Sequence, residues 1–293
     1  MLDWGGTGRA IVLLAGSGNS AHVFDEFAFK LTNCCHLYGI TRRGFGSSSQ
    51  PAAGYDDQRL ADDVLRVLET LQIQAPVLAG HSMAGGEMTT LGHQHSDRLG
   101  GLVYLDALQD PRDGPFGDPA WGALMKKVPQ GPPPCPLDRT SFSALRSSLQ
   151  CTMKFALPEA ELRNTWLTNP DGSVGRYKTP SSVNDAIGRG QKKRDYSNIR
   201  VPVLALFEFP RTSLDQLRPD EPQPRNDEER EALLAAGAMM KAFLDRCVEN
   251  LKRSVPDARI VNLPAAGHFV FITHEAEVLA EIHKFVGKVG EAK

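Results

Sequence analysis

The chain has few cysteines, and their spacing matches no common metal site. Its 293 residues include five cysteines: Cys34, Cys35, Cys135, Cys151 and Cys247. An odd number without C-x-x-C spacing argues against a zinc-binding motif and against a dense disulfide framework. We expect Cys34 and Cys35 to pack as small apolar side chains in a buried strand. A bridge between Cys135 and Cys151 would need an oxidising compartment, and the sequence does not favour it.

The chain also lacks an excess of charge and a long apolar run. Its formal net charge of -2 gives no reason to expect nucleic acid or an anionic membrane surface as a partner. No segment approaches the roughly 18 apolar residues that cross a bilayer. Residues 1–6 are too short and too polar for a secretory signal. We therefore expect a soluble, cytoplasmic protein, or a secreted or periplasmic one if an upstream signal has been removed.

Strand-like and helix-like patterns alternate along most of the chain, which predicts a mostly parallel sheet flanked by helices. Residues 10–14 form a short apolar run that ends in a glycine-rich loop, as a buried strand does. In residues 57–71, Leu60, Val64 and Leu68 recur at helical spacing. Further strands are expected at 34–40, 77–79, 102–105, 201–207 and 259–263, and further helices at 23–31, 83–95, 228–251 and 274–286.

The alternation stops between residues 107 and 198. This segment contains the proline cluster Pro132–Pro134 and short helix-like pieces at 142–149 and 159–167. About 90 residues between two core strands far exceed a normal connection, so they should form a substructure of their own. We expect a core made of residues 1–106 and 199–293, with residues 107–198 inserted between two core strands.

The most informative motif is Gly-His-Ser-Met-Ala at residues 80–84, which follows an apolar run and precedes a helical pattern. A sharp strand-to-helix turn of small residues lifts a serine hydroxyl out at the end of a sheet. The motif resembles the nucleophile elbow, G-x-S-x-G, of the α/β-hydrolase family, with Ala84 in place of the last glycine. The resemblance implies the α/β-hydrolase fold, Ser82 as the nucleophile, and a largely helical cap or lid at residues 107–198.

His268 is the candidate base, since a serine hydroxyl needs a neighbour that takes its proton. It lies in a small-residue loop after the last expected strand, where the family carries its catalytic histidine. Two positions stay open for the acid that orients the imidazole. Asp106, directly after the strand at 102–105, is favoured. Glu208, after the next strand, is second, and Asp215 in the same loop is a further imperfect substitute. Each of these acids preserves the order Ser, acid, His that is typical of the family.

The backbone N–H groups of Ser17 and Met83 are the candidate oxyanion hole. Met83 directly follows the nucleophile, at the positive end of the next helix. Ser17 belongs to the loop Ala15–Gly18 after the first apolar strand, where the family places its second donor. No Gly-Lys-Ser/Thr follows this loop, so it is not a phosphate-binding loop. Gly16 and His22 are the candidate substrate-binding residues beside it.

Two further groups of side chains allow two interpretations each. Glu87, on the helix after the elbow, either faces the core near the site or is partly solvated. The aromatic residues of the insertion form either an apolar substrate pocket or the insertion's own core, and the second interpretation is favoured. These residues are Trp121, Phe142, Phe155 and Trp166.

Together these residues indicate a serine hydrolase, most simply a carboxylesterase that acts on a small to medium ester through an acyl-enzyme. The alternatives are hydrolysis of a lactone, C–C or thioester bond, and a non-catalytic homologue that binds a small molecule. We expect a small-molecule ester as the partner, and no metal ion, organic cofactor, nucleic acid or membrane. The sequence indicates neither the identity of the substrate nor an oligomeric state.

Overall fold

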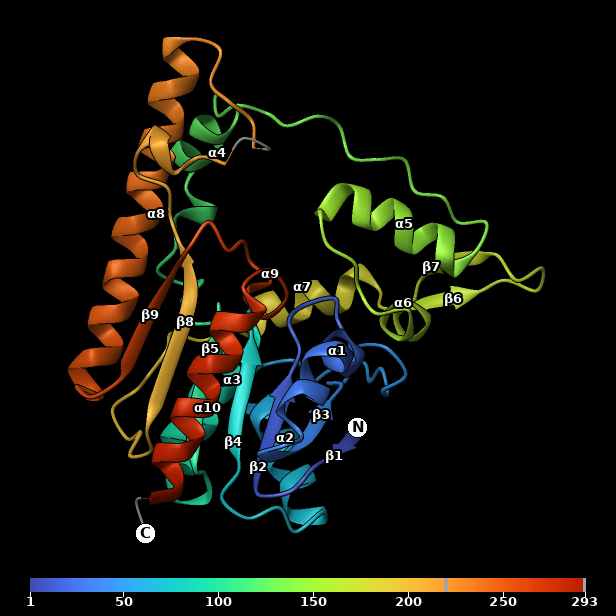
Figure 1. The fold of residues 1–293 in the computed structure, drawn as a ribbon, viewed down its shortest axis with the longest axis vertical. Helices are drawn as coiled ribbons and strands as arrows, with labels where there is room; N and C mark the ends of the chain where they lie inside the picture. Colours follow the sequence, from blue (N-terminus) through green and yellow to red (C-terminus); the bar gives the residue numbers. More distant parts are fainter. Residues whose placement is uncertain (219–220, 292–293) are drawn as a thin grey trace.

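A seven-stranded sheet forms the centre of the computed structural model, which describes residues 1–218 and 221–291 (Figure 1). The strand order is β1-β3-β2-β4-β5-β8-β9, with β1 antiparallel to β3 and all other neighbours parallel. The predicted fold class is therefore confirmed. The strands are β1 (Leu2–Gly5), β2 (Arg9–Leu14), β3 (Cys35–Ile40), β4 (Val77–His81), β5 (Gly101–Leu105), β8 (Val203–Phe209) and β9 (Arg259–Pro264).

The strands are buried on both faces of the sheet. Along β2, Ile11 and Leu13 belong to one buried apolar cluster, whereas Val12 and Leu14 belong to another. This division follows from the two-residue period of a strand, in which successive side chains point to opposite faces. A strand covered on both sides needs an unbroken apolar run, which is why these segments stand out in the sequence.

Helices cover each face of the sheet (Figure 1). The cluster of Ile11 and Leu13 includes residues of η1, α1, η2, α9 and α10, and the cluster of Val12 and Leu14 includes residues of α2, α3 and α8. These elements, with the two short turns outside the clusters, are η1 (Ala21–Phe24), α1 (Asp25–Ala28), η2 (Phe29–Leu31), α2 (Asp57–Thr70), α3 (Ala84–Gln94), η3 (Ser96–Arg98), η5 (Leu214–Gln216), α8 (Asp227–Ser254), α9 (Val270–Thr273) and α10 (Glu275–Glu291).

One predicted helix is wrong in detail. Residues 23–31 do not form one continuous helix but fall within three short turns, η1, α1 and η2. The tighter 3₁₀ turns bring residues three apart to the same face. This spacing buries Phe24 with Phe27 and Ala28 with Leu31 against the sheet.

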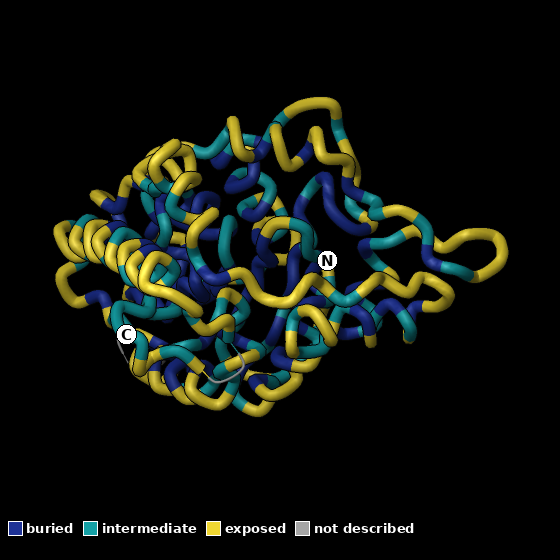
Figure 2. Tube along the Cα trace, turned by 90° about the horizontal axis from the view of Figure 1, so that it is seen from above, coloured by how far each residue is buried: buried dark blue, intermediate teal, exposed yellow. Residues whose placement is uncertain are grey.

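The segment between β5 and β8 has two parts, which lie on opposite sides of the molecule (Figure 1). The first part packs against α8, and the second lies over η1, with its β6–β7 hairpin projecting as an exposed loop (Figure 2). Buried Phe142 and Leu162 of the second part belong to the same apolar cluster as Phe24. The first part holds η4 (Pro115–Gly117) and α4 (Pro119–Met125), and the second holds α5 (Phe142–Met153), α6 (Glu159–Thr165), β6 (Trp166–Thr168), β7 (Val174–Tyr177) and α7 (Ser181–Gly190).

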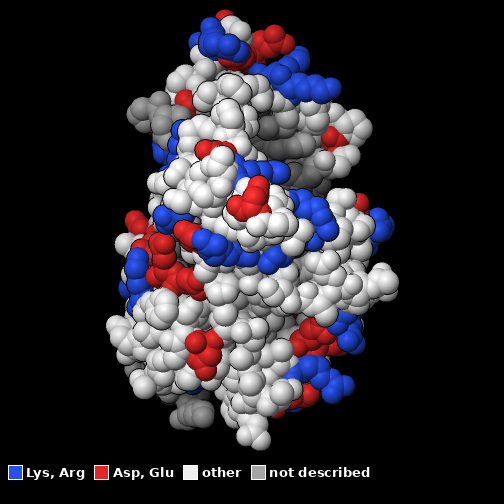
Figure 3. Space-filling model, turned by 90° about the vertical axis from the view of Figure 1, so that its right-hand side faces the viewer, with Lys and Arg blue, Asp and Glu red and all other residues white. Residues whose placement is uncertain are grey.

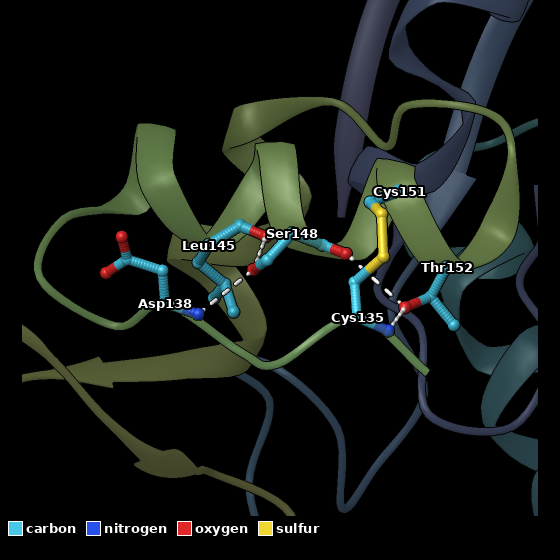
Figure 4. The surroundings of a disulfide bond; sticks show 6 residues. All are labelled: Cys135, Asp138, Leu145, Ser148, Cys151 and Thr152. Atoms are coloured by element: carbon cyan, nitrogen blue, oxygen red, sulfur yellow. Dashed lines mark hydrogen bonds between the residues drawn. A yellow bond between two sulfur atoms is a disulfide. The ribbon is translucent and has the colours of Figure 1, made fainter. Parts of the chain in front are cut away.

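A disulfide joins Cys135 to Cys151, contrary to the expectation from the sequence (Figure 4). It ties the strand-free connection between α4 and α5 to the last turns of α5. Hydrogen bonds support the same contact: Thr152 Oγ1 accepts the N–H of Cys135 at 3.0 Å, and Ser148 Oγ accepts the N–H of Asp138 at 3.2 Å. The sequence could not show this pairing, because it depends on how the connection folds back along α5.

The surface carries charges of both signs. On the face that bears the β6–β7 hairpin, basic side chains form a band across the middle, interspersed with acidic ones, and further groups of charged side chains lie at the top and at the lower right (Figure 3). Within residues 1–218 and 221–291, none of the helices combines the length and the apolar character needed to span a bilayer.

Candidate active site

Ser82 lies at the tip of a strained turn in the middle of the sheet. It directly follows β4 and has a φ of 57°, a left-handed value that is costly for a residue with a side chain. The turn is tight because Gly80 lets the helix pack close: a Cβ there would lie 2.9 Å from that of Ala84. The N–H of Ser82 also donates to Leu105 O at 3.2 Å, which ties the turn to β5.

The structure brings His268 to Ser82 from the opposite end of the sequence. Nε2 of His268 lies 2.8 Å from Ser82 Oγ, and its Nδ1 lies 2.5 Å from Asp106 Oδ2. The loop after β9 presents the ring through two residues with positive φ, Ala265 at 58° and Gly267 at 71°. The three side chains therefore form a continuous chain of hydrogen bonds from carboxylate to hydroxyl.

Asp106, and not Glu208, is the carboxylate that contacts His268 Nδ1. Asp106 is buried, and its second carboxylate oxygen accepts the side chain of Gln109 at 2.8 Å and the N–H of Glu208 at 3.3 Å. The Glu208 carboxylate instead pairs with Arg211 at 2.8 Å. Gln109, which the sequence did not single out, thus helps to fix the carboxylate that faces His268.

His81 is a second histidine of the site that sequence reasoning missed. It is 1% exposed, and its Nε2 lies 2.9 Å from the backbone oxygen of His268. Because a carbonyl only accepts, Nε2 carries the proton and Nδ1 does not. Nδ1 is buried without a partner among the described residues. Burial, followed by the nearby His268, lowers the pKa of His81 to about 3. The position of His81 directly before Ser82 was the sequence signal that could have placed it in the site.

We expect His81 to make the folded state sensitive to acid. Its pKa is about 3 in the folded chain, whereas an unfolded chain has a histidine pKa of about 6.5. Between these values only the unfolded state binds the proton, so the free energy of unfolding falls by about 1.4 kcal/mol for each unit of decreasing pH. His81→Gln, which keeps a donor for the His268 carbonyl, should flatten this dependence by about that amount. Urea unfolding of both proteins across this range tests the slope, and equal slopes would contradict it.

The loop after β2 lies directly against the elbow. A Cβ added to Gly16 would lie 3.1 Å from the Ser82 Cβ and 2.7 Å from His81 Nδ1, so only glycine fits there. In the parts of the chain that the structure describes, neither the Ser17 N–H nor the Met83 N–H donates to a protein oxygen. Both N–H groups are therefore without a protein acceptor among the described residues, and Met83 lines the cavity at Ser82.

Three side chains of the insertion hold this loop. Glu161 accepts the Ser20 hydroxyl at 2.5 Å and the Asn19 amide at 3.0 Å. Tyr177 donates its hydroxyl to Gly18 O, and the Ser17 hydroxyl donates to Asn184 Oδ1 at 3.2 Å. The pKa of Glu161 is raised by burial, which these hydrogen bonds partly offset.

His22 does not reach the cavity beside Ser82. Its Nδ1 lies 2.9 Å from Asp25, and the side chain forms part of the N-terminal end of η1. The prediction that His22 binds substrate is therefore not supported by its position. The turn η1 aims its apolar residues at the sheet, which leaves His22 on the other side next to Asp25.

Glu87 faces the core, which decides between the two interpretations left open. Its carboxylate pairs with Arg42 at 2.6 Å, and both side chains are almost fully buried. Burial raises the pKa of Glu87, while Arg42 opposes this rise. Arg42 also donates to Ala15 O at 2.7 Å, so the pair fastens the start of the loop that carries Gly16 and Ser17.

A cavity of about 540 Å³ opens at Ser82 and His268. Its walls are mostly apolar and come from α4, including Trp121, and from α8, including Met240 and Leu244. Sequence reasoning missed the role of α8, although its apolar residues recur at helical spacing. The remaining lining residues are Met83, Asp106, Gln109, Pro111, Phe116, Met125, Val128, Gln191, Arg194, Glu208, Pro210, Arg211, Leu233, Ala236 and Gly237.

The four aromatic residues of the insertion do not form one cluster, and each lies in different surroundings. Trp121 lines the cavity, whereas Phe142 is buried in the apolar cluster under the sheet. Phe155 packs against Phe269 with ring centres 5.2 Å apart, and Trp166 packs against Tyr177 at 5.5 Å. Among the described residues, no group of three or more His, Cys, Asp or Glu is placed to hold a metal ion.

Solved structures of other proteins share this fold. The structure superposes on that of E-2-(acetamidomethylene)succinate hydrolase with a TM-score of 0.68 and 19% identity, covering 97% of this chain and 93% of the other. A structure described as a marine microorganism esterase gives a TM-score of 0.61 at 18% identity, covering 99% and 97%. At these identities the similarity shows the fold.

Curated relatives match over a shorter part. A putative non-heme chloroperoxidase from Synechocystis sp. is 38% identical over 102 residues, which covers 34% of this chain and 37% of that protein. A 2-(acetamidomethylene)succinate hydrolase from Mesorhizobium japonicum is 26% identical over 101 residues, covering 34% and 36%. The chain thus matches little more than a third of the length of these relatives. A model described as the alpha/beta hydrolase family matches residues 11–282. The chain belongs to the alpha/beta hydrolase family.

Proposed function

We propose that this protein is a serine hydrolase that cleaves small to medium carboxylic esters through an acyl-enzyme. The observation that carries the proposal is the hydrogen-bonded chain from Asp106 through His268 to Ser82, with distances of 2.5 and 2.8 Å, at the opening of a largely apolar cavity. This arrangement has the parts of a serine hydrolase triad. A small-molecule ester is the proposed partner.

The first half of the reaction forms the acyl-enzyme. Ser82 Oγ attacks the ester carbonyl while His268 Nε2 takes the hydroxyl proton. The negative oxygen of the tetrahedral intermediate binds the free N–H groups of Ser17 and Met83, which the turn and the loop hold in advance. As the C–O bond breaks, the imidazolium returns its proton to the leaving alcohol. Asp106 keeps the proton on Nδ1 and stabilises the positive ring.

The second half repeats these steps with water. His268 removes a proton from a water molecule, and the resulting hydroxide attacks the acyl carbonyl bound to Ser82. The intermediate collapses, the carboxylic acid leaves, and the proton returns to Ser82 Oγ. No further reactant is required for the balance of atoms.

We propose that residues 107–198 act as a cap over this site. Their first part supplies Trp121 and Met125 to the wall of the cavity. Their second part holds the loop of Ser17 through Glu161 and Tyr177. The cap would therefore select the substrate at one end and support the oxyanion hole at the other.

A series of 4-nitrophenyl esters with increasing acyl length tests the proposed function. We expect release of 4-nitrophenolate by the wild type, with kcat/KM highest for an acyl chain that fills the apolar cavity and lower for longer chains. Circular dichroism of the same preparation should show that the protein is folded. A folded wild type that cleaves no member of the series would contradict the proposal.

Glu161→Gln should weaken the oxyanion loop. Both carboxylate oxygens of Glu161 accept hydrogen bonds from Asn19 and Ser20, whereas glutamine has one acceptor oxygen and an NH2 group that would face these donors, so the loop of Ser17 loses part of its support. Complete loss of one oxyanion donor costs about 10²–10³ in rate, and a displaced donor should lower kcat by about tenfold with little change in KM. Glu159→Gln, an exposed change on the same helix, is the matched control. A lower melting temperature with unchanged kcat would show that Glu161 only stabilises the fold.

A further inference from the structure

The charged side chains of the cavity are paired, with one exception. Asp106 faces His268 at 2.5 Å, and Arg211 pairs with Glu208 at 2.8 Å and with Glu221 through its Nε at 2.8 Å. Arg194 also lines the cavity, yet no carboxylate of residues 1–218 and 221–291 lies within ion-pair distance of its guanidinium.

The guanidinium of Arg194 is held by neutral oxygens only. It donates to Gln109 O at 3.0 Å, to Ala107 O at 3.4 Å and to Thr89 Oγ1 at 3.5 Å. The residue is 7% exposed, and a guanidinium keeps its charge at all ordinary pH values. A buried cation without a counter-ion is unfavourable, and a bound anion would relieve this cost.

Two acidic side chains near Arg194 accept hydrogen bonds from backbone N–H groups. Asp110 accepts the backbone N–H of Arg194 at 2.8 Å and that of Arg112 at 3.0 Å. Asp57 accepts the backbone N–H of Lys192 at 2.8 Å. Both carboxylates therefore accept backbone N–H groups, and neither lies within ion-pair distance of the guanidinium, although the charges of Asp57 and Arg194 attract each other at longer range.

Arg194 lines the same cavity as Ser82 and His268. Its Nη1 lies against Gly85 in the first turn of α3, where a Cβ would collide with it and with Ala107 O. The Gly85 N–H in turn donates to Ser82 O at 3.1 Å. Gln191 lines the same cavity, and no hydrogen bond joins its side-chain amide to a described residue. A charged donor and a free amide thus accompany the apolar wall beside the nucleophile.

We propose that the preferred substrate is an ester that also bears a carboxylate, which Arg194 and Gln191 bind while the ester carbonyl lies at Ser82. This proposal rests on the proposed hydrolase function. The hydrocarbon between the two groups contacts the apolar side chains of α4 and α8. A guanidinium binds a carboxylate with two parallel hydrogen bonds, so the second group also fixes the direction of the substrate.

Two pairs of simple alkyl esters test this proposal. Within each pair the esters differ only in a terminal carboxylate or a primary amide, on the acyl side in one pair and on the alcohol side in the other. The rate of hydrolysis is measured from the protons that the reaction releases. We expect kcat/KM to be about tenfold or more higher for the acid than for the amide in at least one pair, as charge-assisted hydrogen bonds to a ligand predict.

Variants assign the preference to Arg194. Arg194→Gln should bring the acid-to-amide ratio close to one, and Arg194→Lys should leave an intermediate ratio. Lys193→Gln removes a neighbouring positive charge that is exposed and does not line the cavity, and it should keep the wild-type ratio. If Arg194→Gln does not fold, the acid-to-amide ratios of the wild type and Arg194→Lys still test the proposal. Equal ratios in these two proteins would contradict a role for Arg194.

Failure of this proposal is distinct from failure of the proposed function. Neutral esters cleaved as well as acidic ones in both pairs would overturn the carboxylate site and leave the hydrolase function intact. An acid preference that survives in Arg194→Gln would overturn the role of Arg194. A folded wild type that cleaves no ester and forms no covalent adduct with a fluorophosphonate would overturn the proposed function itself.

Discussion

Ser82→Ala is expected to abolish covalent labelling and almost all turnover. A fluorophosphonate reacts with a serine whose proton a neighbouring base can take, and His268 Nε2 lies 2.8 Å from Ser82 Oγ. Intact-protein mass should show one adduct on the wild type and none on the variant. Removal of such a nucleophile lowers kcat by about 10⁵–10⁶-fold, because the other members of the triad cannot act without it. Ester hydrolysis by the same preparations measures this loss.

Controls give each outcome of the labelling a separate meaning. Ser147→Ala, an exposed change on α5, should keep the adduct. An adduct that persists on Ser82→Ala would show that a different side chain is the nucleophile. No adduct on a folded wild type would favour a protein that binds small molecules without turning them over.

The parts of the site that were predictable from the sequence are local in the chain. The elbow at Ser82 depends on a strand, small neighbours and a helix that all lie within residues 77–94, and each has its own signal. The strands around it were readable because a sheet covered on both faces requires unbroken apolar runs. The loop of His268 was found by its place in the order of elements and by the family resemblance.

The parts that were not predictable depend on packing between distant segments. Asp106 directly follows β5 and Glu208 lies near the end of the neighbouring β8, and only the contact of Asp106 with His268 decides between them. The hydrogen bond from Ser20 to Glu161 joins residues 141 positions apart. The disulfide and the cavity wall from α8 also arise from such contacts. Helical periodicity shows which face of a helix is apolar, but not whether that face meets the core or a cavity.

The exchange Asp106→Asn tests the last member of the proposed triad with little change of backbone. Asp106 has a φ of 46°, and asparagine tolerates this left-handed conformation better than other residues, so the turn should survive. The asparagine amide can donate to His268 Nδ1, which would move the ring proton to Nε2 and prevent it from accepting the proton of Ser82. We therefore expect kcat to fall by about 10³–10⁴-fold with KM little changed.

The matched variant is Glu208→Gln. It removes the other acid that the sequence left open, whose carboxylate contacts Arg211 and not His268. Its effect on kcat should stay below about tenfold, because the change removes an ion pair with Arg211 at the cavity wall and no contact of His268. Equal losses in both variants would show that Asp106 has no special role. A large loss in Glu208→Gln alone would assign the acid to Glu208, since the order of the triad along the chain permits either residue and the short contact to Nδ1 distinguishes them.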